Sequence, residues 1–184
     1  MSRDEVSDEL DRVLRESQRL GFLGERPIPE VIAHARVFVA PLVDVEGAVI
    51  DLGSGGGVPG LVIAHDRPDL NVTLADRRGK RTDFLVRVVA RLGWSERVTV
   101  VNDDVERIIE RTPGVFSAAV ARGFGPPPET LRMGRDLVAP SGRIVISEPP
   151  SGDRWPDELL DELGVHRIAT DDSTVAVFER ACFT

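Results

Sequence analysis

A glycine-rich turn directly behind a buried strand constrains this chain more than any other feature. Residues 50–60 read I-D-L-G-S-G-G-G-V-P-G, and they follow an apolar run that begins at Ala48. Four glycines within five positions allow backbone with φ > 0 and leave bare main chain that a ligand can approach. This pattern predicts a buried parallel strand that turns sharply into a helix beside a cofactor.

A second apolar run, residues 71–75, ends in an acidic residue, Asp76. The carboxyl ends of parallel strands meet at one edge of a sheet, and ligands bind in the crevice there. The two segments therefore predict a nucleotide-cofactor pocket at this edge.

Apolar runs that alternate with helical periodicity predict an α/β fold, with a mostly parallel sheet and a closing antiparallel hairpin. We expect two helices near the N-terminus, at about 4–20 and 30–39. Residues 1–45 would form a helical cap, and residues 46–184 the cofactor-binding domain. The expected strands are 48–52, 71–75, 98–101, 116–120, 143–146, 165–170 and 174–180, and the expected helices between them are 58–65, 79–92, 104–110, 128–138 and 155–163.

The composition bears on where the protein acts and on which cofactors it can hold. No apolar stretch approaches the roughly 20 residues of a membrane helix, and the charged start has no apolar region behind it, so we expect neither membrane segment nor signal peptide. A single cysteine, Cys182, excludes an internal disulfide, and no His, Asp and Glu grouping has metal-ligand spacing. We expect a cytoplasmic protein without a metal; its oligomeric state stays open.

The net charge of −8 counts against a broad nucleic-acid face. The sharpest basic cluster, R-R-G-K-R at residues 77–81, lies just after Asp76. It is either a solvated helix start or a local contact for phosphate or RNA.

Two cofactors compete for the glycine loop. The pattern G-x-G-x-x-G over residues 55–60, with Asp76 as the ribose acid, is the fingerprint of NAD-dependent oxidoreductases. The pattern G-x-G-x-G over residues 53–57, behind Asp51, is typical of S-adenosylmethionine methyltransferases. The latter is favoured because the glycines begin at the strand end and because Pro59 interrupts the helix start that NAD would need. A glycine turn without ligand is the third alternative.

The residues D-R-R-G-K-R-T-D-F-L at 76–85, together with D-L-G-S-G-x-G-x-P-G at 51–60, resemble the RsmG (GidB) family. The resemblance covers about residues 48–145, with looser matches at 100–106 and 120–124. It implies a Rossmann-like class I methyltransferase fold, S-adenosylmethionine as cofactor, and guanine N7 of small-subunit (16S) ribosomal RNA, alone or in the 30S particle, as methyl acceptor. Attack by N7 needs no general base, because the neutral base carries a free lone pair there.

The resemblance also implies a set of residues that line the cofactor or lie beside it: Gly53, Gly55, Gly57, Val58, Asp76, Asp104, Val105, Glu106 and Arg122. Asp76 would accept hydrogen bonds from the ribose hydroxyls. Asp104 and Glu106 would face the adenine, or else serve only as helix N-terminal acids. Arg122 is the one candidate for positioning the substrate, or else a surface salt-bridge partner, and no catalytic base is identified.

The chain departs from the family on the substrate side. The motif Trp-Asn … Asn-Leu-Thr is absent, and Arg-His-x-x-Asp-Ser survives at most as His34. Where the family has Lys-Gly after the fifth strand, this chain has S-E-P-P at residues 147–150, and a Glu148 in place of the Lys would reverse the charge near an RNA phosphate. A short divergent paralogue that methylates a small molecule, or that binds the cofactor without catalysis, therefore stays open. Phe124 could stack on a base or simply pack at the rim.

Overall fold

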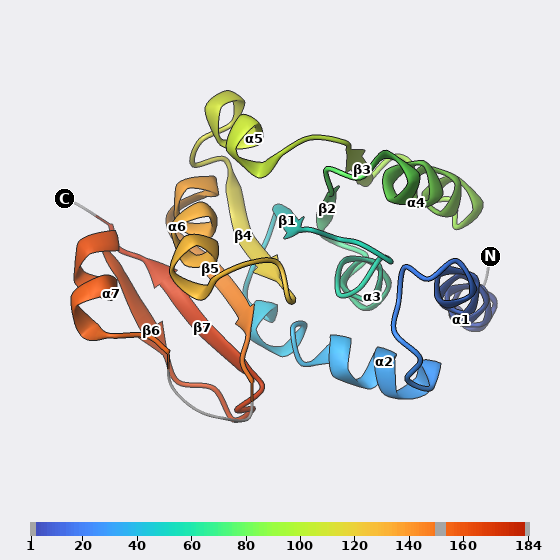
Figure 1. Cartoon of the computed structure of the whole chain (residues 1–184), viewed down its shortest axis with the longest axis horizontal. Helices are drawn as coiled ribbons and strands as arrows, with labels where there is room; N and C mark the ends of the chain where they lie inside the picture. Colours follow the sequence, from blue (N-terminus) through green and yellow to red (C-terminus); the bar gives the residue numbers. More distant parts are fainter. Residues whose placement is uncertain (1–2, 150–153, 183–184) are drawn as a thin grey trace.

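The computed structural model describes residues 3–149 and 154–182, which form a seven-stranded sheet flanked by helices (Figure 1). The strand order is β3-β2-β1-β4-β5-β7-β6. The strands are β1 (Ala48–Leu52), β2 (Asn71–Ala75), β3 (Val98–Val101), β4 (Phe116–Ala121), β5 (Val138–Ser147), β6 (Val165–Ile168) and β7 (Val175–Arg180). The helices are α1 (Arg3–Arg19), α2 (Ile28–Arg36), α3 (Gly60–Asp66), α4 (Gly79–Arg91), α5 (Val105–Arg111), α6 (Pro127–Leu137) and α7 (Asp157–Leu163), with a 3₁₀ turn at Ala40–Leu42.

The pairing of the strands confirms the predicted α/β class. β1 lies between β2 and β4 and pairs with both in parallel, and β5 continues the parallel set. β7 is antiparallel to both β5 and β6, so the closing hairpin inserts one reversed strand. The order reverses at β1, which places a crevice at its carboxyl end.

The sheet separates two apolar layers because successive side chains of a strand point to opposite faces. Val49 packs with α1 to α4 on one face, and its neighbour Ile50 packs with α5 to α7 on the other. Parallel strands covered on both faces read as nearly continuous apolar runs, which is why β1 and β4 are mostly apolar, with Asp51 and Ser117 as their polar members.

The N-terminal helices share the core of the first face. Leu10, Val13 and Leu14 of α1 are buried in the same cluster as α3 and α4. At the end of α1 the hydroxyl of Ser17 donates a hydrogen bond of 2.9 Å to the carbonyl of Gly56. The helical segment therefore lies directly on the glycine loop; the division at residue 45 stays a prediction.

Several element boundaries differ from the predicted ranges, and two of these differences have a clear physical reason. β5 begins at Val138, five residues early, because residues 140–142, expected as a turn, form an irregularity within the strand, with Ser141 at φ 61°. α2 begins at Ile28 because Pro27 serves as its N-cap and Pro29 sits in the first turn, where no backbone N–H is needed.

Candidate functional site

The glycine loop that follows β1 turns beneath the crevice. Gly53 has φ +69°, and a Cβ atom there would lie 2.7 Å from the ring of Phe124. Gly57 has φ +100°, and a Cβ atom there would lie 2.4 Å from Leu61. L-residues with a Cβ rarely adopt such backbone, so both positions require glycine for conformation and for space. The first faces the crevice, whereas the second faces the core.

Asp76 is held rigidly at the end of β2. The amide of Gly55 donates to its Oδ2 and the amide of Arg78 donates to its Oδ1, each at 2.9 Å. Arg81 forms an ion pair with the Asp76 carboxylate at 3.7 Å. The backbone carbonyl of Asp76 accepts a hydrogen bond from the side-chain amide of Asn102. A carboxylate has about four acceptor positions, so two backbone donors leave room for two ligand hydroxyls.

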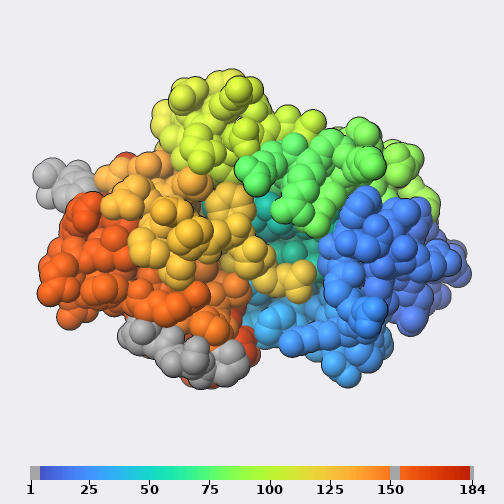
Figure 2. All heavy atoms as spheres, viewed as in Figure 1, coloured from blue at the N-terminus to red at the C-terminus, as the bar shows by residue number. Residues whose placement is uncertain are grey.

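These segments enclose a cavity of about 330 Å³ at the carboxyl ends of β1, β2 and β4. Figure 2 shows the hollow on this face between the green start of α4, the yellow-green α5 and the gold loop that leads into α6. Its wall is formed by Gly53, Ala75, Asp76, Arg77, Arg78, Arg81, Asp103, Asp104, Val105, Glu106, Gly123, Phe124, Gly125, Pro126, Glu129, Thr130 and Met133. A volume of this size suits part of a nucleoside-sized ligand.

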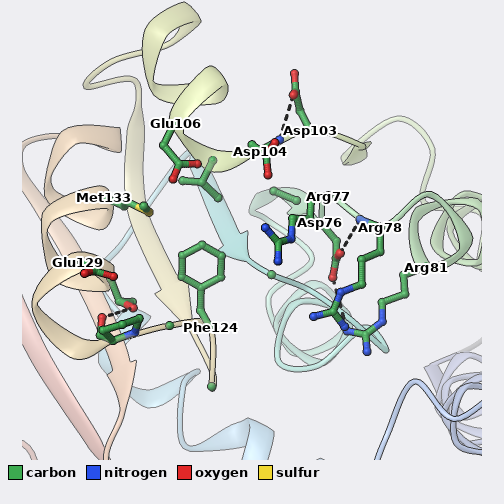
Figure 3. Close-up of a pocket in the computed structure, with 17 residues that line it drawn as sticks. Asp76, Arg77, Arg78, Arg81, Asp103, Asp104, Glu106, Phe124, Glu129 and Met133 are labelled. Carbon is green, nitrogen blue, oxygen red and sulfur yellow. Dashed lines mark hydrogen bonds and ion pairs between the residues drawn. The ribbon is translucent and has the colours of Figure 1, made fainter.

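One wall of the cavity is acidic (Figure 3). Asp104 precedes α5 and Glu106 lies in its first turn, and both side chains are exposed. Asp104 makes no side-chain cap to the helix. Asp103 is engaged by Arg111 at 2.7 Å, which lowers the pKa of its carboxyl. Asp104 and Glu106 therefore offer free acceptors to a ligand amino group.

The opposite wall comes from the loop after β4 and from α6. The ring of Phe124 is half-buried and stands between the acidic wall and α6 (Figure 3). Glu129 and Met133, four residues apart on α6, complete this wall. The hydroxyl of Ser147 accepts a hydrogen bond of 3.2 Å from the amide of Gly123, which ties the loop to the end of β5.

The nine residues that the resemblance implies fall into two groups. Five of them line the cavity: Gly53, Asp76, Asp104, Val105 and Glu106. The other four lie outside its lining: Gly55, Gly57, Val58 and Arg122. Gly55 instead supplies the amide that holds Asp76, and Val58 is buried in the core. The ligand roles of all nine stay predictions.

Arg122 lies beyond the glycine loop, near the buried Asp51. Burial raises the pKa of Asp51 to about 6, whereas the Gly60 amide and Arg122 draw it down. Oδ2 of Asp51 accepts the Gly60 amide at 3.0 Å, and its Oδ1 has no hydrogen-bond partner in the structure. Burial lowers the pKa of Arg122, and Asp51 opposes that shift.

Glu148 does not reverse the charge at the crevice in the way its sequence position suggested. Its side chain is 5% exposed and its Oε1 accepts hydrogen bonds from Arg154 at 3.0 Å and from Trp155 at 2.8 Å. The carboxylate is thus neutralised inside a structural cluster. Pro150, the last residue of the compared segment 147–150, lies outside the described residues.

Sequence reasoning overlooked most of the cavity wall beyond the glycine loop. Arg77, Arg78 and Arg81 belong to the basic cluster predicted either as a solvated helix start or as a phosphate or RNA contact beside the pocket, and all three line the cavity itself. Glu129 and Met133 were missed, although their spacing of four on a helix that follows β4 is a usable signal. The cavity lies at the carboxyl ends of the parallel strands, so the sequence could have indicated every loop that follows such a strand as part of its wall.

His65 and His166 make contacts of a structural kind. His65, in the last turn of α3, contacts the Ser7 hydroxyl at 3.0 Å and Asp66 at 2.6 Å. His166 lies in β6, within the closing hairpin. Among the residues described, no group of three or more His, Cys, Asp and Glu side chains could hold a metal ion, and no helix is long and apolar enough to cross a bilayer.

The chain is similar in sequence to ribosomal RNA methyltransferases. It is 42% identical over 107 residues to the ribosomal RNA small subunit methyltransferase G of Acidothermus cellulolyticus, a match that covers 58% of this chain and 46% of the relative. It is 36% identical over 158 residues to the protein of the same name from Salinispora tropica, which covers 82% of this chain and 62% of the relative. The chain thus spans about half to two thirds of the relatives' length.

The structural comparison shows the fold, and the family comparison shows the membership. A putative S-adenosyl-L-methionine-dependent methyltransferase from Methanococcus maripaludis superposes with a TM-score of 0.66 at 14% identity, covering 100% of this chain and 95% of that one. The model of the GidB family, described as rRNA small subunit methyltransferase G, matches residues 9–156. The chain therefore belongs to the GidB family.

Proposed function

We propose that this protein is an S-adenosylmethionine-dependent methyltransferase whose methyl acceptor is small-subunit ribosomal RNA. The observation that carries the proposal is Asp76, a carboxylate fixed by two backbone amides at the edge of a cavity behind a glycine loop. Family membership supports it, because the described relatives are named as methyltransferases of that RNA.

The donor set of the cavity fits this cofactor. Asp76 has acceptor capacity left for two ribose hydroxyls, and Asp104 and Glu106 can accept from the adenine amino group. Val105 is a buried apolar residue beside them. The glycine at position 53 leaves main chain open to a ligand, since a Cβ atom there would fill the approach. S-adenosylmethionine supplies a methyl group on a positively charged sulfur.

In this proposal the residues of the chain align the reactants, and no residue has to remove a proton from the acceptor. Methyl transfer is an in-line displacement, so its rate depends on alignment of donor, methyl and acceptor. We propose guanine N7 as the acceptor atom, as the family resemblance implies, because its lone pair needs no general base. The ring of Phe124 stands at the cavity wall, where an aromatic face can stack on the target base.

Action on ribosomal RNA would place the protein in the cytoplasm, where the RNA or the 30S particle is its partner. The net charge of −8 favours a different acceptor, a small molecule, over a polyanion. The distribution of the basic residues weighs more than the total charge, because Arg77, Arg78 and Arg81 line the cavity.

The test begins with calorimetric titration of the purified chain with S-adenosylmethionine, S-adenosylhomocysteine and NAD. Binding of the first two without NAD supports the cofactor assignment, whereas binding of NAD alone overturns it. Transfer of a labelled methyl group to small-subunit ribosomal RNA, free or in 30S particles, then tests the acceptor. Cofactor binding with no transfer to either substrate would contradict the RNA assignment and favour the small-molecule acceptor.

A further inference from the structure

One glycine of the loop belongs to neither cofactor pattern. Gly56 falls between the patterned glycines of residues 53–60, and it has no positive φ, so its backbone conformation does not require glycine. Space requires it instead: a Cβ atom on Gly56 would lie 2.6 Å from the hydroxyl of Ser17 and 2.6 Å from the side chain of Leu23. The end of α1 and the segment that follows it therefore pack directly against the glycine loop, although neither residue lines the cavity.

Ser17 makes this contact specific. The residue is 0% exposed, and its hydroxyl donates a hydrogen bond of 2.9 Å to the carbonyl of Gly56, 39 positions along the chain. A helical serine often returns its hydroxyl to a carbonyl of its own helix, whereas this one is directed to another segment. Removing such a bond is costly because the buried carbonyl is left without a partner. The end of α1 is thus fastened to one peptide group of the loop.

The peptide group that joins Gly56 to Gly57 is held at both ends. Its carbonyl accepts the hydrogen bond from Ser17, and its N–H donates to the carbonyl of Ser54 at 2.7 Å. The two groups of a planar trans peptide point in opposite directions, so these partners lie on opposite sides of it. The flanking glycines have no Cβ atom to resist rotation of the peptide. The two hydrogen bonds therefore fix its orientation.

The same arrangement continues to Asp76. The carbonyl of Ser54 belongs to the peptide group whose N–H, on Gly55, donates to Oδ2 of Asp76 at 2.9 Å. Three hydrogen bonds thus run in series from the hydroxyl of Ser17 through two peptide groups to the carboxylate, and we call this series the peptide relay. Hydrogen bonds in such chains polarise and strengthen one another. The relay links a buried side chain of α1 to the carboxylate that the proposed function assigns to the ribose.

We propose that Ser17 is a positioning residue for S-adenosylmethionine, which acts through the peptide relay on Asp76 and makes α1 part of the cofactor site. This deepens the proposed function and rests on it. Without the Ser17 hydroxyl the first peptide of the relay can rotate, which removes the donor of the second peptide's carbonyl and loosens the amide that holds Asp76. Affinity for a ligand falls in proportion to the fraction of molecules that keep the binding-competent arrangement.

The test compares two variants of α1 by calorimetric titration with S-adenosylhomocysteine. Ser17→Ala removes the hydroxyl, and we expect the affinity to fall about three- to tenfold, the range that corresponds to the loss of one hydrogen bond. Val13→Ala is the matched control, because it truncates a buried apolar side chain one turn earlier in the same helix and leaves the relay intact. It should lower the stability measured by urea unfolding but keep the affinity within about twofold of the unaltered protein.

A second ligand shows whether the effect passes through Asp76. The 2′,3′-dideoxy analogue of S-adenosylhomocysteine lacks both ribose hydroxyls, so it gains nothing from a well-placed Asp76. Ser17→Ala should therefore bind the analogue within about twofold of the unaltered protein, although it binds S-adenosylhomocysteine more weakly. An equal loss of affinity for both compounds would show that Ser17 supports the loop as a whole, and it would overturn the relay.

A third variant keeps the test decisive if Ser17→Ala is unfolded by circular dichroism. Ser17→Cys retains a side chain of similar size with a weaker donor, so its affinity for S-adenosylhomocysteine should lie below that of Val13→Ala; an affinity no weaker would overturn the relay.

The remaining outcomes separate the two proposals. If the unaltered chain binds S-adenosylhomocysteine and Ser17→Ala loses no more affinity than Val13→Ala, Ser17 is purely structural, and the relay is wrong while the proposed function stands. Failure of the unaltered chain to bind S-adenosylhomocysteine contradicts the proposed function itself, and the relay with it.

Discussion

The two sides of the cavity mouth are built in different ways. On the β2 side, which comprises Asp76 and the residues up to 81, main-chain amides hold the key carboxylate. On the β4 side, which comprises Arg122, Phe124 and Glu148, side chains make the contacts: the Ser147 hydroxyl holds the loop after β4, and Arg154 and Trp155 hold Glu148. The β2 side keeps the family pattern, whereas on the β4 side the pattern matches only loosely at residues 120–124 and is lost at Glu148. Backbone contacts tolerate few sequence changes, whereas a surface assembled from side chains can be rebuilt residue by residue.

The largest expected effect is on the β2 side. Asp76→Ala should reduce affinity for S-adenosylhomocysteine at least about 100-fold, because two charge-assisted hydrogen bonds of about 1.5–3 kcal/mol each are lost. The fold should persist, since its core lies elsewhere. Calorimetry with the variant, and circular dichroism to check folding, measures this. Asp76→Asn, which keeps the shape, should lose less; equal affinity in all three proteins would remove Asp76 from the cofactor site.

The second prediction tests whether Glu148 is structural. Glu148→Lys restores the basic residue of the family, but places it against Arg154 in a site that is 5% exposed. We expect the free energy of unfolding to fall by about 3 kcal/mol, since a buried pair becomes a repulsive one. Urea unfolding measures the loss, and Glu148→Gln, which can still accept from Trp155, should cost about 1 kcal/mol. Stronger RNA binding at unchanged stability would show instead that this position faces the RNA.

The third prediction concerns the buried carboxylate between the two sides. Burial raises the pKa of Asp51 to about 6, from 3.8 in the unfolded chain. Between about pH 4 and pH 6 the folded state therefore holds a proton that the unfolded state has lost, so this group's contribution to stability falls as the pH rises through that window. The full shift corresponds to about 3 kcal/mol.

Asp51→Asn keeps an acceptor for the Gly60 amide and removes the buried charge. The free energy of unfolding of Asp51→Asn, relative to that of the unaltered protein, should increase between pH 4 and pH 7. Only the unaltered protein loses stability when the buried carboxyl ionises. Urea unfolding of both proteins at the two pH values checks this. A stability difference that does not change with pH would show that Asp51 is ionised at no cost, through Arg122.

The smallest expected effect joins the two sides. Gly53→Ala places a Cβ atom 2.7 Å from the Phe124 ring at φ +69°, and should destabilise the fold by about 1–2 kcal/mol. Phe124→Ala in the same chain should recover the steric part and leave the backbone part. A double-mutant cycle by urea unfolding measures the coupling energy. Strict additivity would mean that the ring moves aside freely and that the two sides are independent.

Local sequence patterns determined the skeleton of this protein. Strands β1, β2 and β3 match their predicted ranges residue for residue, because buried parallel strands are continuous apolar runs between turn residues. Asp76 was predicted at the edge of the pocket on the same grounds, since a strand end fixes where its next residue lies. The family motifs reside in these segments, so membership could also be inferred from the sequence.

Only the tertiary structure determined which side chains contact one another on the β4 side and which charges there are paired. The hydrogen bond between the Gly123 amide and the Ser147 hydroxyl joins the ends of β4 and β5, and no local sequence period records such a contact. The neutralisation of Glu148 depends on Arg154 and Trp155, which fold back onto the end of β5. A residue's type and its place after a strand follow from the sequence, but whether its charge is paired depends on which distant side chains the packed core brings beside it.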